Sequence, residues 1–357
     1  MISFASDNHA GVHPAVLAAI ADANHGFTPA YGADPWTEKL RGEVKREFGP
    51  HAIAFPVFNG TGANVVALSS MLKRFEAVIA VEKAHIDFDE CGAPERLGGF
   101  KLLTVPSSDQ KLRPEQVRER LSRRGDTHAV QPRVISIAQS TELGTIYSLD
   151  EIKALADLAH EEGLYVHMDG ARISNAAASL GCSLAECTTD VGVDVLSFGG
   201  TKNGLLAGEA VIGLSEQYLL NFSEDLRYGQ KQGMQLASKM RFFSAQMLAL
   251  LEKELWRKNA VHANKMAERL ADEVWGSPGL EIVQRVEANA VFARLPRKVI
   301  SPLQAKFPFY TWDESDAESG TAVVRWMTSF QTQEEHVRAF ALELKRLLAD
   351  VLLEAEA

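Results

Sequence analysis

The stretch LYVHMDGARISNAAASLGCSLAECTTDVGVDVLSFGGTKNG, residues 164–204, decides the fold class of this chain. Its apolar runs at residues 164–168 and 193–198 have the length of strands and are apolar enough to be buried on both faces. Asp169 follows the first run and Lys202 follows the second, 33 positions later. That separation leaves room for one helix and one strand, so the two runs can lie side by side in a parallel sheet.

The same alternation of strands and helices extends through the first two thirds of the chain. Strand-like runs occupy residues 53–57, 77–81, 102–105, 134–138 and 210–214. Apolar positions at helical spacing predict helices over residues 35–48 and 64–73. Ser148 and Glu151 form a capping box that opens a further helix, which we expect to stop at Gly163. This order predicts an α/β fold with a mostly parallel sheet and helices on both of its faces.

The pattern changes after about residue 245. A long helical pattern runs from Met247 to Leu270, and strand-like runs and a last helix capped by Thr332 follow it. The strand-like runs are residues 282–286, 290–295 and 322–328. We therefore predict a large domain over residues 1–245 and a small α+β domain over residues 246–357. The N-terminal segment is a candidate to pack against the small domain.

Composition narrows the class of partner. The 357 residues carry a formal net charge of −10, which argues against nucleic acid or an anionic membrane surface as the main partner. The three cysteines form no C-x-x-C pair, so we expect no metal site and a reducing, cytoplasmic location. We also find no secretory signal pattern and no apolar run of about 18 residues that could span a bilayer.

The segment NGTGAN, residues 59–64, lies where a strand-like run meets a helical one. Backbone N–H groups at a helix N-terminus attract anions, and the glycines let the backbone approach closely. The segment matches neither a P-loop nor a dinucleotide fingerprint. It is either a compact phosphate cup or a tight turn that only starts the helix.

The segment HMDGAR, residues 167–172, lies at the carboxyl end of a predicted parallel strand, where open α/β sheets bind ligands. Asp169 there can pair with a protonated ring nitrogen of a cofactor. His167 would then support the Asp169 carboxylate without contacting the cofactor itself. Arg172 could hold a carboxylate with two hydrogen bonds. The alternative is a buried pair of Asp169 and Arg172 that ties down a loop.

Lys202 stands between Thr201 and Asn203, just past a buried strand, and so is not placed like a surface lysine. Its amine could form a Schiff base with an aldehyde, although an ordinary loop lysine is the alternative. Together the three segments are more specific than each one alone. A phosphate cup, an acid for a pyridine nitrogen and a Schiff-base lysine are the parts of a pyridoxal-phosphate site.

With these motifs the chain resembles the low-specificity threonine aldolases, which are fold-type I pyridoxal-phosphate enzymes of the β-eliminating lyase superfamily. The resemblance covers essentially the whole chain. It is carried by FASDNHAG, AYGADPW, FNGTGAN, HIDFDECGAPE, VHMDGAR, SFGGTKNG and QLASKMRF, between residues 4 and 242, and by EANAVFARL and VVRWM in the small domain.

The resemblance implies pyridoxal 5′-phosphate as cofactor and a role for each matching residue. Lys202 would bind the cofactor aldehyde, Asp169 the ring nitrogen, and His85 would stack on the ring. The phosphate would be held by Gly60, Thr61 and Thr201, with Arg241 reaching it across a subunit interface. Arg172 and Arg325 would grip the substrate carboxylate, and Ser6 and Tyr31 would line the site, with Tyr31 coming from the partner subunit. The expected assembly is a homodimer or homotetramer with active sites at the subunit interface.

The implied reaction is cleavage of L-threonine, L-allo-threonine or a related β-hydroxy-α-amino acid to glycine and an aldehyde. The alternative is another reaction on the same cofactor: β-elimination, transamination or decarboxylation. A non-catalytic protein that binds a phosphorylated small molecule is the rival from another class. One position departs from several relatives, because Glu142 stands where they have a histidine. The general base therefore stays open between His85, a bound water and Glu142.

Overall fold

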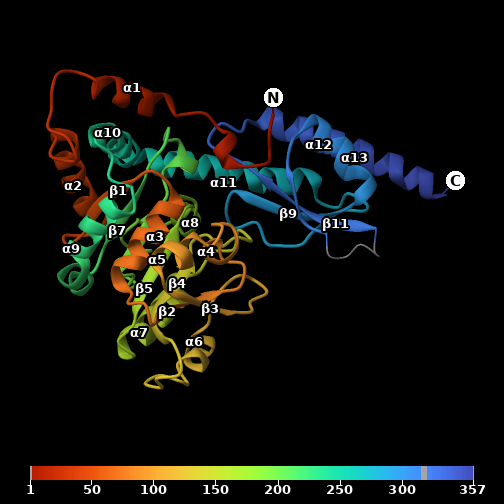
Figure 1. Cartoon of the computed structure of the whole chain (residues 1–357). Coiled ribbons are helices and arrows are strands. Elements are labelled where there is room, and N and C mark those ends of the chain that lie inside the picture. The colour runs from red at the N-terminus through yellow and green to blue at the C-terminus, as the bar shows by residue number, and fades with distance from the viewer. Residues whose placement is uncertain (1, 315–319, 357) are drawn as a thin grey trace. The chain divides into compact units, whose positions relative to one another are not determined.

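The computed structural model describes residues 2–314 and 320–356. The chain divides into two compact units by its own contacts. The larger unit comprises Val12–Glu142 and Ile146–Trp256, and the smaller comprises Met1–Gly11, Leu143–Thr145 and Arg257–Ala357. Figure 1 shows the helices and strands of both.

The larger unit is built on a seven-stranded sheet in the order β1-β7-β6-β5-β4-β2-β3. Its strands are β1 (Ile53–Val57), β2 (Glu76–Val81), β3 (Lys101–Val105), β4 (Gln131–Ala138), β5 (Tyr165–Gly170), β6 (Val195–Phe198) and β7 (Glu209–Gly213). Neighbouring strands are parallel except that β7 runs antiparallel to both β1 and β6. These pairings confirm the prediction of a mostly parallel α/β sheet. Every residue of β5, β6 and β7 is buried, as expected for central strands.

Helices of the larger unit pack on this sheet or on one another (Figure 1). They are α1 (Pro14–Asp22), α2 (Pro35–Phe48), α3 (Gly60–Met71), α4 (His85–Phe88), α5 (Ala93–Gly98), α6 (Pro114–Arg120), α7 (Leu149–Glu161), α8 (Ile173–Leu180), α9 (Glu216–Gln232) and α10 (Met240–Leu251). The predicted helix at residues 35–48 is confirmed as α2, which Asp34 caps by accepting a hydrogen bond from the Thr37 N–H at 2.9 Å. Helix α3 is buried along most of its length because it packs against β6 and β7 and also against α5 and α9.

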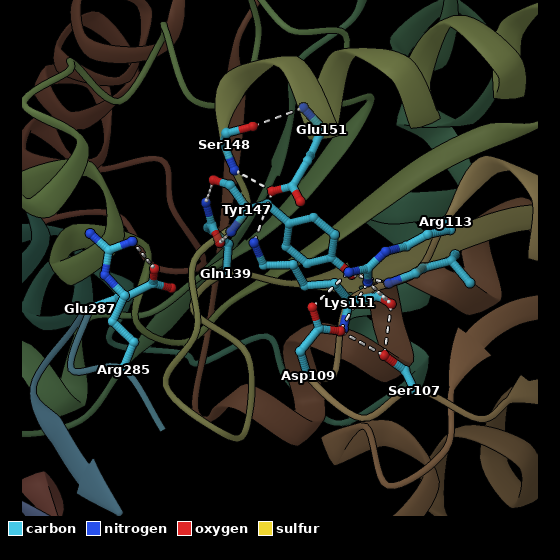
Figure 2. Close-up of polar contacts among 11 residues, drawn as sticks. Ser107, Asp109, Lys111, Arg113, Gln139, Tyr147, Ser148, Glu151, Arg285 and Glu287 are labelled. Atoms are coloured by element: carbon cyan, nitrogen blue, oxygen red, sulfur yellow. Dashed lines mark hydrogen bonds and ion pairs between the residues drawn. The ribbon is translucent and has the colours of Figure 1, made fainter. Parts of the chain in front are cut away.

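Helix α7 begins as predicted from its capping box. The Glu151 N–H donates to Ser148 Oγ at 3.1 Å, and the Ser148 N–H donates to Glu151 Oε2 at 2.8 Å. The loop between β3 and α6 is fastened to this helix start (Figure 2). Lys111 Nζ pairs with Glu151 at 2.9 Å, and the Leu112 N–H donates to the hydroxyl of Tyr147 at 2.6 Å. Within the loop Arg113 holds Asp109 through two hydrogen bonds of 2.9 and 2.6 Å, which keep the pKa of Asp109 well below its ordinary value.

The helical pattern between Met247 and Leu270 belongs to two helices and not to one. Helix α10 ends at Leu251, a short 3-10 turn, η3 (Glu252–Glu254), follows, and α11 spans Leu255–Val274. Lys253 and Glu254 have φ angles of 57° and 54°, in the left-handed region, and this breaks the helix. The sequence gives no sign of the break, because no glycine or proline marks it and the apolar spacing continues across it.

The smaller unit has an antiparallel sheet in the order β10-β11-β9-β8. Its other elements include two helices, α12 and α13, which lie beside β9 and β11 in Figure 1. The bounds are η1 (Asp7–His9), β8 (Glu281–Ile282), β9 (Ala290–Pro296), α12 (Arg297–Lys306), β10 (Tyr310–Asp313), β11 (Thr321–Met327) and α13 (Glu334–Glu356). Of the run predicted as a strand at residues 282–286, only Ile282 lies in a strand, as the last residue of β8.

The N-terminal segment is built into the core of this smaller unit. The Phe4 side chain is fully buried, and its ring centroid lies 4.7 Å from that of Phe340 on α13. The Phe4 N–H donates to the Pro308 carbonyl at 2.8 Å, and its carbonyl accepts from the Met327 N–H at 2.7 Å. Two backbone hydrogen bonds and a buried aromatic contact thus fix this segment in place.

Among residues 2–314 and 320–356, no helix combines the length and the apolar composition that crossing a membrane requires.

Candidate active site

Asp169 and the loop of Lys202 come from neighbouring strands of the larger unit. Asp169 pairs in register with Ser197 where β5 and β6 run parallel. Lys202 lies in η2 (Thr201–Asn203), four residues after the end of β6. Both therefore lie at the carboxyl edge of the sheet, where ligands of open α/β folds bind.

The Asp169 carboxylate is buried and hydrogen-bonded at both oxygens. Oδ1 accepts from the Ala171 N–H at 3.0 Å, and Oδ2 accepts from Asn64 Nδ2 at 2.9 Å. Burial by itself raises the pKa of Asp169, but His85, the Asn64 amide and Lys202 outweigh it and hold the pKa below the ordinary value. This carboxyl group is therefore kept charged in a buried place, as a partner for a cation should be.

His85, at the start of α4, lies beside the same carboxylate. Its Nδ1 lies 2.8 Å from Glu90 Oε1. One ring nitrogen of His85 and one carboxylate oxygen each of Glu90 and Asp169 all lie within 4.8 Å of one another. The hydrogen bond to Glu90 is the main cause that raises the pKa of His85; burial opposes it, and the charges of Asp169 and Glu142 add to it. The His85 side chain keeps 31% of its surface exposed, so one part of the ring stays accessible.

Asn64 connects these groups. Its Nδ2 donates to Glu90 Oε1 at 2.8 Å as well as to Asp169, and its side chain is almost fully buried on α3. Asn64 and Glu90 were not among the residues predicted for the site, although both lie inside motifs that were singled out. The sequence does hold one signal for Asn64: it is a polar residue among apolar ones, Ala63, Val65 and Val66, in a predicted helix.

His167 does not have the role that its spacing suggested. Its ring lies between two hydroxyl groups, with Nδ1 2.9 Å from Ser136 Oγ and Nε2 2.9 Å from Ser197 Oγ. Both nitrogens are thereby used, so neither supports Asp169. Full burial lowers the pKa of His167 to about 4, and the ring is neutral at neutral pH. It joins three neighbouring strands, β4, β5 and β6.

The N-terminus of α3 forms the predicted turn. Asn59 caps the helix by accepting a hydrogen bond from the Gly62 N–H at 2.8 Å. Gly60 and Thr61 are the first two residues of the helix and are half-buried. Their position at a helix start gives them N–H groups without partners inside the helix, which suits an anion.

Glu209 on β7 lies under the lysine loop and was also missed. Its carboxylate accepts from the Gly200 N–H at 2.5 Å and from the Thr201 N–H at 3.4 Å. Burial raises the pKa of Glu209 to about 7, although these N–H groups and the charge of Lys202 oppose the rise. The group thus fixes the backbone immediately before Lys202. No spacing rule pointed to it, because its partners are backbone atoms.

The remaining predicted residues are distributed as follows. Arg172 is half-buried at the N-cap position of α8, three residues after Asp169. Arg241 on α10 donates to the Gly26 carbonyl at 3.2 Å and to Thr28 Oγ1 at 3.3 Å. Tyr31 is more than half exposed, and its N–H donates to the Ser238 carbonyl at 3.0 Å.

Ser6 and Arg325 belong to the smaller unit. Ser6 caps η1 by accepting a hydrogen bond from the Asn8 N–H at 3.2 Å. Arg325 lies on β11 with its guanidinium 4.7 Å from the ring centroid of Trp312 and 5.9 Å from that of Tyr310. In the larger unit, the charges of His85 and Lys202 act on Asp169, and Thr201 precedes Lys202 in η2.

Comparison with known proteins identifies the family. The family described as beta-eliminating lyase matches residues 3–297. The low specificity L-threonine aldolase of Pseudomonas sp. strain NCIMB 10558 is 44% identical over 97% of this chain and 98% of its own. The protein of the same name from Pseudomonas aeruginosa is 42% identical over 97% of each chain.

Solved structures agree with this assignment. A threonine aldolase of Leishmania major is 31% identical and superimposes with a TM-score of 0.91, covering 98% of this chain and 100% of that one. Oryza sativa TDC, solved with PLP and tryptamine, is 18% identical with a TM-score of 0.72 over 96% of this chain and 82% of its own, which shows a shared fold. The site geometry, the relatives and the fold lead to one conclusion: the chain is an enzyme of the beta-eliminating lyase family and belongs to its low-specificity L-threonine aldolases.

Proposed function

We propose that this enzyme binds pyridoxal 5′-phosphate at Lys202 and cleaves L-threonine, L-allo-threonine or a related β-hydroxy-α-amino acid to glycine and an aldehyde. The observation that carries the proposal is the position of Lys202, which follows the strand next to the buried, charged Asp169 and is close enough for its charge to lower the pKa of Asp169. The two Pseudomonas relatives, which are named low specificity L-threonine aldolases, support it.

The residues present fit this cofactor. A carboxylate whose pKa is held low despite burial suits a protonated pyridine nitrogen, and Asp169 meets that condition. Gly60 and Thr61 at the start of α3, with Thr201 beside the lysine, suit a phosphate group. When bound, the cofactor supplies an aldehyde that condenses with amines and a ring that accepts electrons from the bond being broken.

The protein's own groups have the following roles in the proposal. Lys202 would hold the cofactor through its amine. Arg172 and Arg325 bind the substrate carboxylate and so orient the bond between Cα and Cβ. Asp169, which accepts from Asn64, would keep the ring nitrogen protonated, and His85, which is hydrogen-bonded to Glu90, would pack on the ring face. Loss of the β-hydroxyl proton releases the aldehyde, and a proton added at Cα completes glycine.

Three groups are candidates to take the hydroxyl proton: His85, Glu142 and a bound water. Glu142 is close enough to His85 for its charge to raise the pKa of that ring. The variants His85→Asn and Glu142→Gln separate the candidates. The variant of the true base loses kcat with threonine while still binding the cofactor. If both variants keep most of kcat, water is the base.

We include a homodimer or homotetramer in the proposal, with Arg241 and Tyr31 reaching the partner's site. The segments around Tyr31, Phe58 and Arg241 expose large apolar side chains. Hydrogen bonds join residues 235–241 to residues 26–31 and to Phe58. The exposed side chains are Phe27, Tyr31, Phe58, Tyr228 and Met234. Such a concentration is typical of a protein–protein interface. A cytoplasmic location fits the three cysteines, all of which are free thiols.

A mixing experiment tests the shared site. Lys202→Ala and Arg241→Ala are each expected to be inactive alone. If Arg241 serves the partner's site, a hybrid of the two variants contains one site with both residues intact and regains activity. If Arg241 serves its own chain's site, every site in the hybrid carries one defect and the mixture stays inactive.

The test of the reaction uses purified protein with added cofactor. We expect a yellow protein, and borohydride followed by mass analysis should place the mass of the reduced cofactor on the peptide of Lys202. Incubation with L-threonine should yield glycine and acetaldehyde, and Lys202→Ala should abolish turnover. Pyruvate-type keto acids with ammonia would indicate β-elimination, a new amino acid from an added keto acid would indicate transamination, and a colourless protein with no adduct would contradict the proposal.

A further inference from the structure

A buried chain of hydrogen bonds connects Asp169 with His85 through two residues that have no assigned role. Asn64 Nδ2 lies 2.9 Å from Asp169 Oδ2 and 2.8 Å from Glu90 Oε1, and the same Glu90 oxygen lies 2.8 Å from His85 Nδ1. Asn64 is 1% exposed, and the Glu90 side chain is completely buried. The chain is thus shielded from water along its middle.

The chemistry of these atoms leaves one arrangement of hydrogens. A carboxylate accepts hydrogen bonds and an amide nitrogen donates two, so Asn64 uses both of its N–H bonds to hold two carboxylates side by side. Glu90 Oε1 then accepts from His85 as well, which places a proton on Nδ1. This fixes the tautomer and orientation of the ring, and Nε2 is left as the nitrogen whose protonation changes.

We propose that Asn64 and Glu90 are positioning residues: Glu90 sets the orientation and charge of His85, and Asn64 links Glu90 rigidly to Asp169. In the proposed function His85 lies on the face of the cofactor ring and Asp169 at its nitrogen. The Asn64 side chain thus fixes the positions of both groups relative to each other. The inference rests on the proposed function for what His85 and Asp169 contact. The linkage itself is a property of the protein without cofactor.

The electrostatic surroundings agree with this assignment. The charges that raise the pKa of His85 are those of Asp169, Glu142 and Glu90, all of them acids. The hydrogen bond that His85 donates to Glu90 is the largest cause of this raised pKa. Lys202 acts on the Asp169 end of the chain. Removing the Glu90 charge should therefore affect His85 more than removing the charge of Glu142.

The first experiment follows the titration of His85 by NMR in cofactor-free protein labelled with ¹³C-histidine. The ten histidines are separated by assigning His85 with a His85→Gln variant. We expect Glu90→Gln to move the His85 titration to lower pH. His160, which pairs with Asp194 at 3.0 Å in the same unit, serves as an internal reference that should not move. An unchanged His85 titration in Glu90→Gln overturns the role of Glu90.

The second experiment tests the link through Asn64. Glu90→Gln is introduced into wild type and into Asn64→Ala, and the shift of the His85 titration is compared. If Asn64 holds Glu90 in place, the shift should be clearly smaller in the Asn64→Ala background, since contacting residues are not additive. Equal shifts in the two backgrounds overturn the link. Asn64→Ser, which keeps one donor, replaces Asn64→Ala if that variant does not fold.

A matched control and a separate readout complete the design. Asn289 is equally buried and donates to Asp7 Oδ2 at 3.1 Å in the smaller unit, so Asn289→Ala should lower stability without moving the His85 titration. Cofactor affinity is then measured for the same variants, and we expect Asn64→Ala to weaken it by about tenfold or more, about 1.4 kcal/mol. If wild type binds no cofactor, the proposed function fails, while the two titration experiments still decide this inference.

Discussion

Gly199 and Ala171 approach so closely that a methyl group on Gly199 would lie 2.3 Å from the Ala171 carbonyl oxygen. The contact is between backbones, because the Gly199 N–H also donates to the Gly170 carbonyl at 3.0 Å. The chain leaving β5 and the chain leaving β6 therefore run against each other. This keeps the loop of Lys202 next to Asp169.

Gly199→Ala should be strongly destabilising, because the backbone of one loop must move to admit the methyl group. We expect a loss of about 3 kcal/mol or more in the free energy of unfolding. Gly181→Ala is the control: Gly181 has a φ of +68° but no atom within 4 Å of an added methyl, so its cost is about 1–2 kcal/mol of backbone strain. Urea unfolding of both variants measures the difference, and equal losses would contradict the close approach.

Glu209 should make stability fall between about pH 4.5 and pH 7. Burial raises its pKa from 4.5 to about 7, so in this window the folded protein holds a proton that the unfolded chain has released. The free energy of unfolding therefore decreases as pH rises, by about 3 kcal/mol in total. Glu209→Gln, unfolded without cofactor at pH 5 and pH 8, should remove this part of the dependence. A wild-type slope in the variant would show that Glu209 does not titrate there.

His160 should contribute a pH dependence in the adjoining range. Its hydrogen bond to Asp194 raises its pKa above 6.5, so its contribution to stability is complete below the unfolded pKa and is lost as pH rises through the folded pKa. His160→Gln should lose this dependence, and His128→Gln, at an exposed position, should keep it. Thermal unfolding between pH 5 and pH 9 compares the three proteins, and a parallel course for His160→Gln and wild type would argue against the pair.

Tyr147→Phe should cost about 1–3 kcal/mol, since it leaves the Leu112 N–H buried without an acceptor. Tyr147 is 1% exposed, so water cannot easily replace its hydroxyl (Figure 2). Tyr165→Phe is a milder counterpart, because the Tyr165 hydroxyl accepts from the side chain of Asn221, an exposed residue that can turn to water. Chemical unfolding ranks the two, and the prediction requires the larger loss for Tyr147→Phe.

Local patterns were sufficient to predict much of the large sheet and the ends of its strands. The predicted bounds of the strand at residues 53–57 and of the helix at residues 35–48 match the structure to the residue. For the helix, the apolar spacing agrees with Asp34 at its start and Gly49 at its end. The adjacency of Asp169 and Lys202 also followed from sequence, since one crossover was enough to connect their strands. These predictions depend on contacts that are close in sequence or repeated along a strand.

Other features depend on partners that sequence spacing does not relate. Asn64 and Asp169 are 105 positions apart, and Glu209 bonds backbone atoms, so neither link could be read from residue types. His167 shows the opposite error: the spacing of two along the strand was correct, yet hydroxyl groups on both neighbouring strands took its nitrogens. The break at Lys253 was hidden because a polar pair with left-handed backbone leaves no mark in the pattern.

The burial of Phe4 sets the order in which the chain can finish folding during synthesis. Phe340 is made 336 positions after Phe4, which takes about 20–70 s at ordinary rates of translation. The apolar segment around Phe4 has no complete site to occupy until its neighbours Pro308, Met327 and Phe340 have all been made. The segment around Phe4 is thus made before its neighbours in the core and is among the last parts of the smaller unit to be packed.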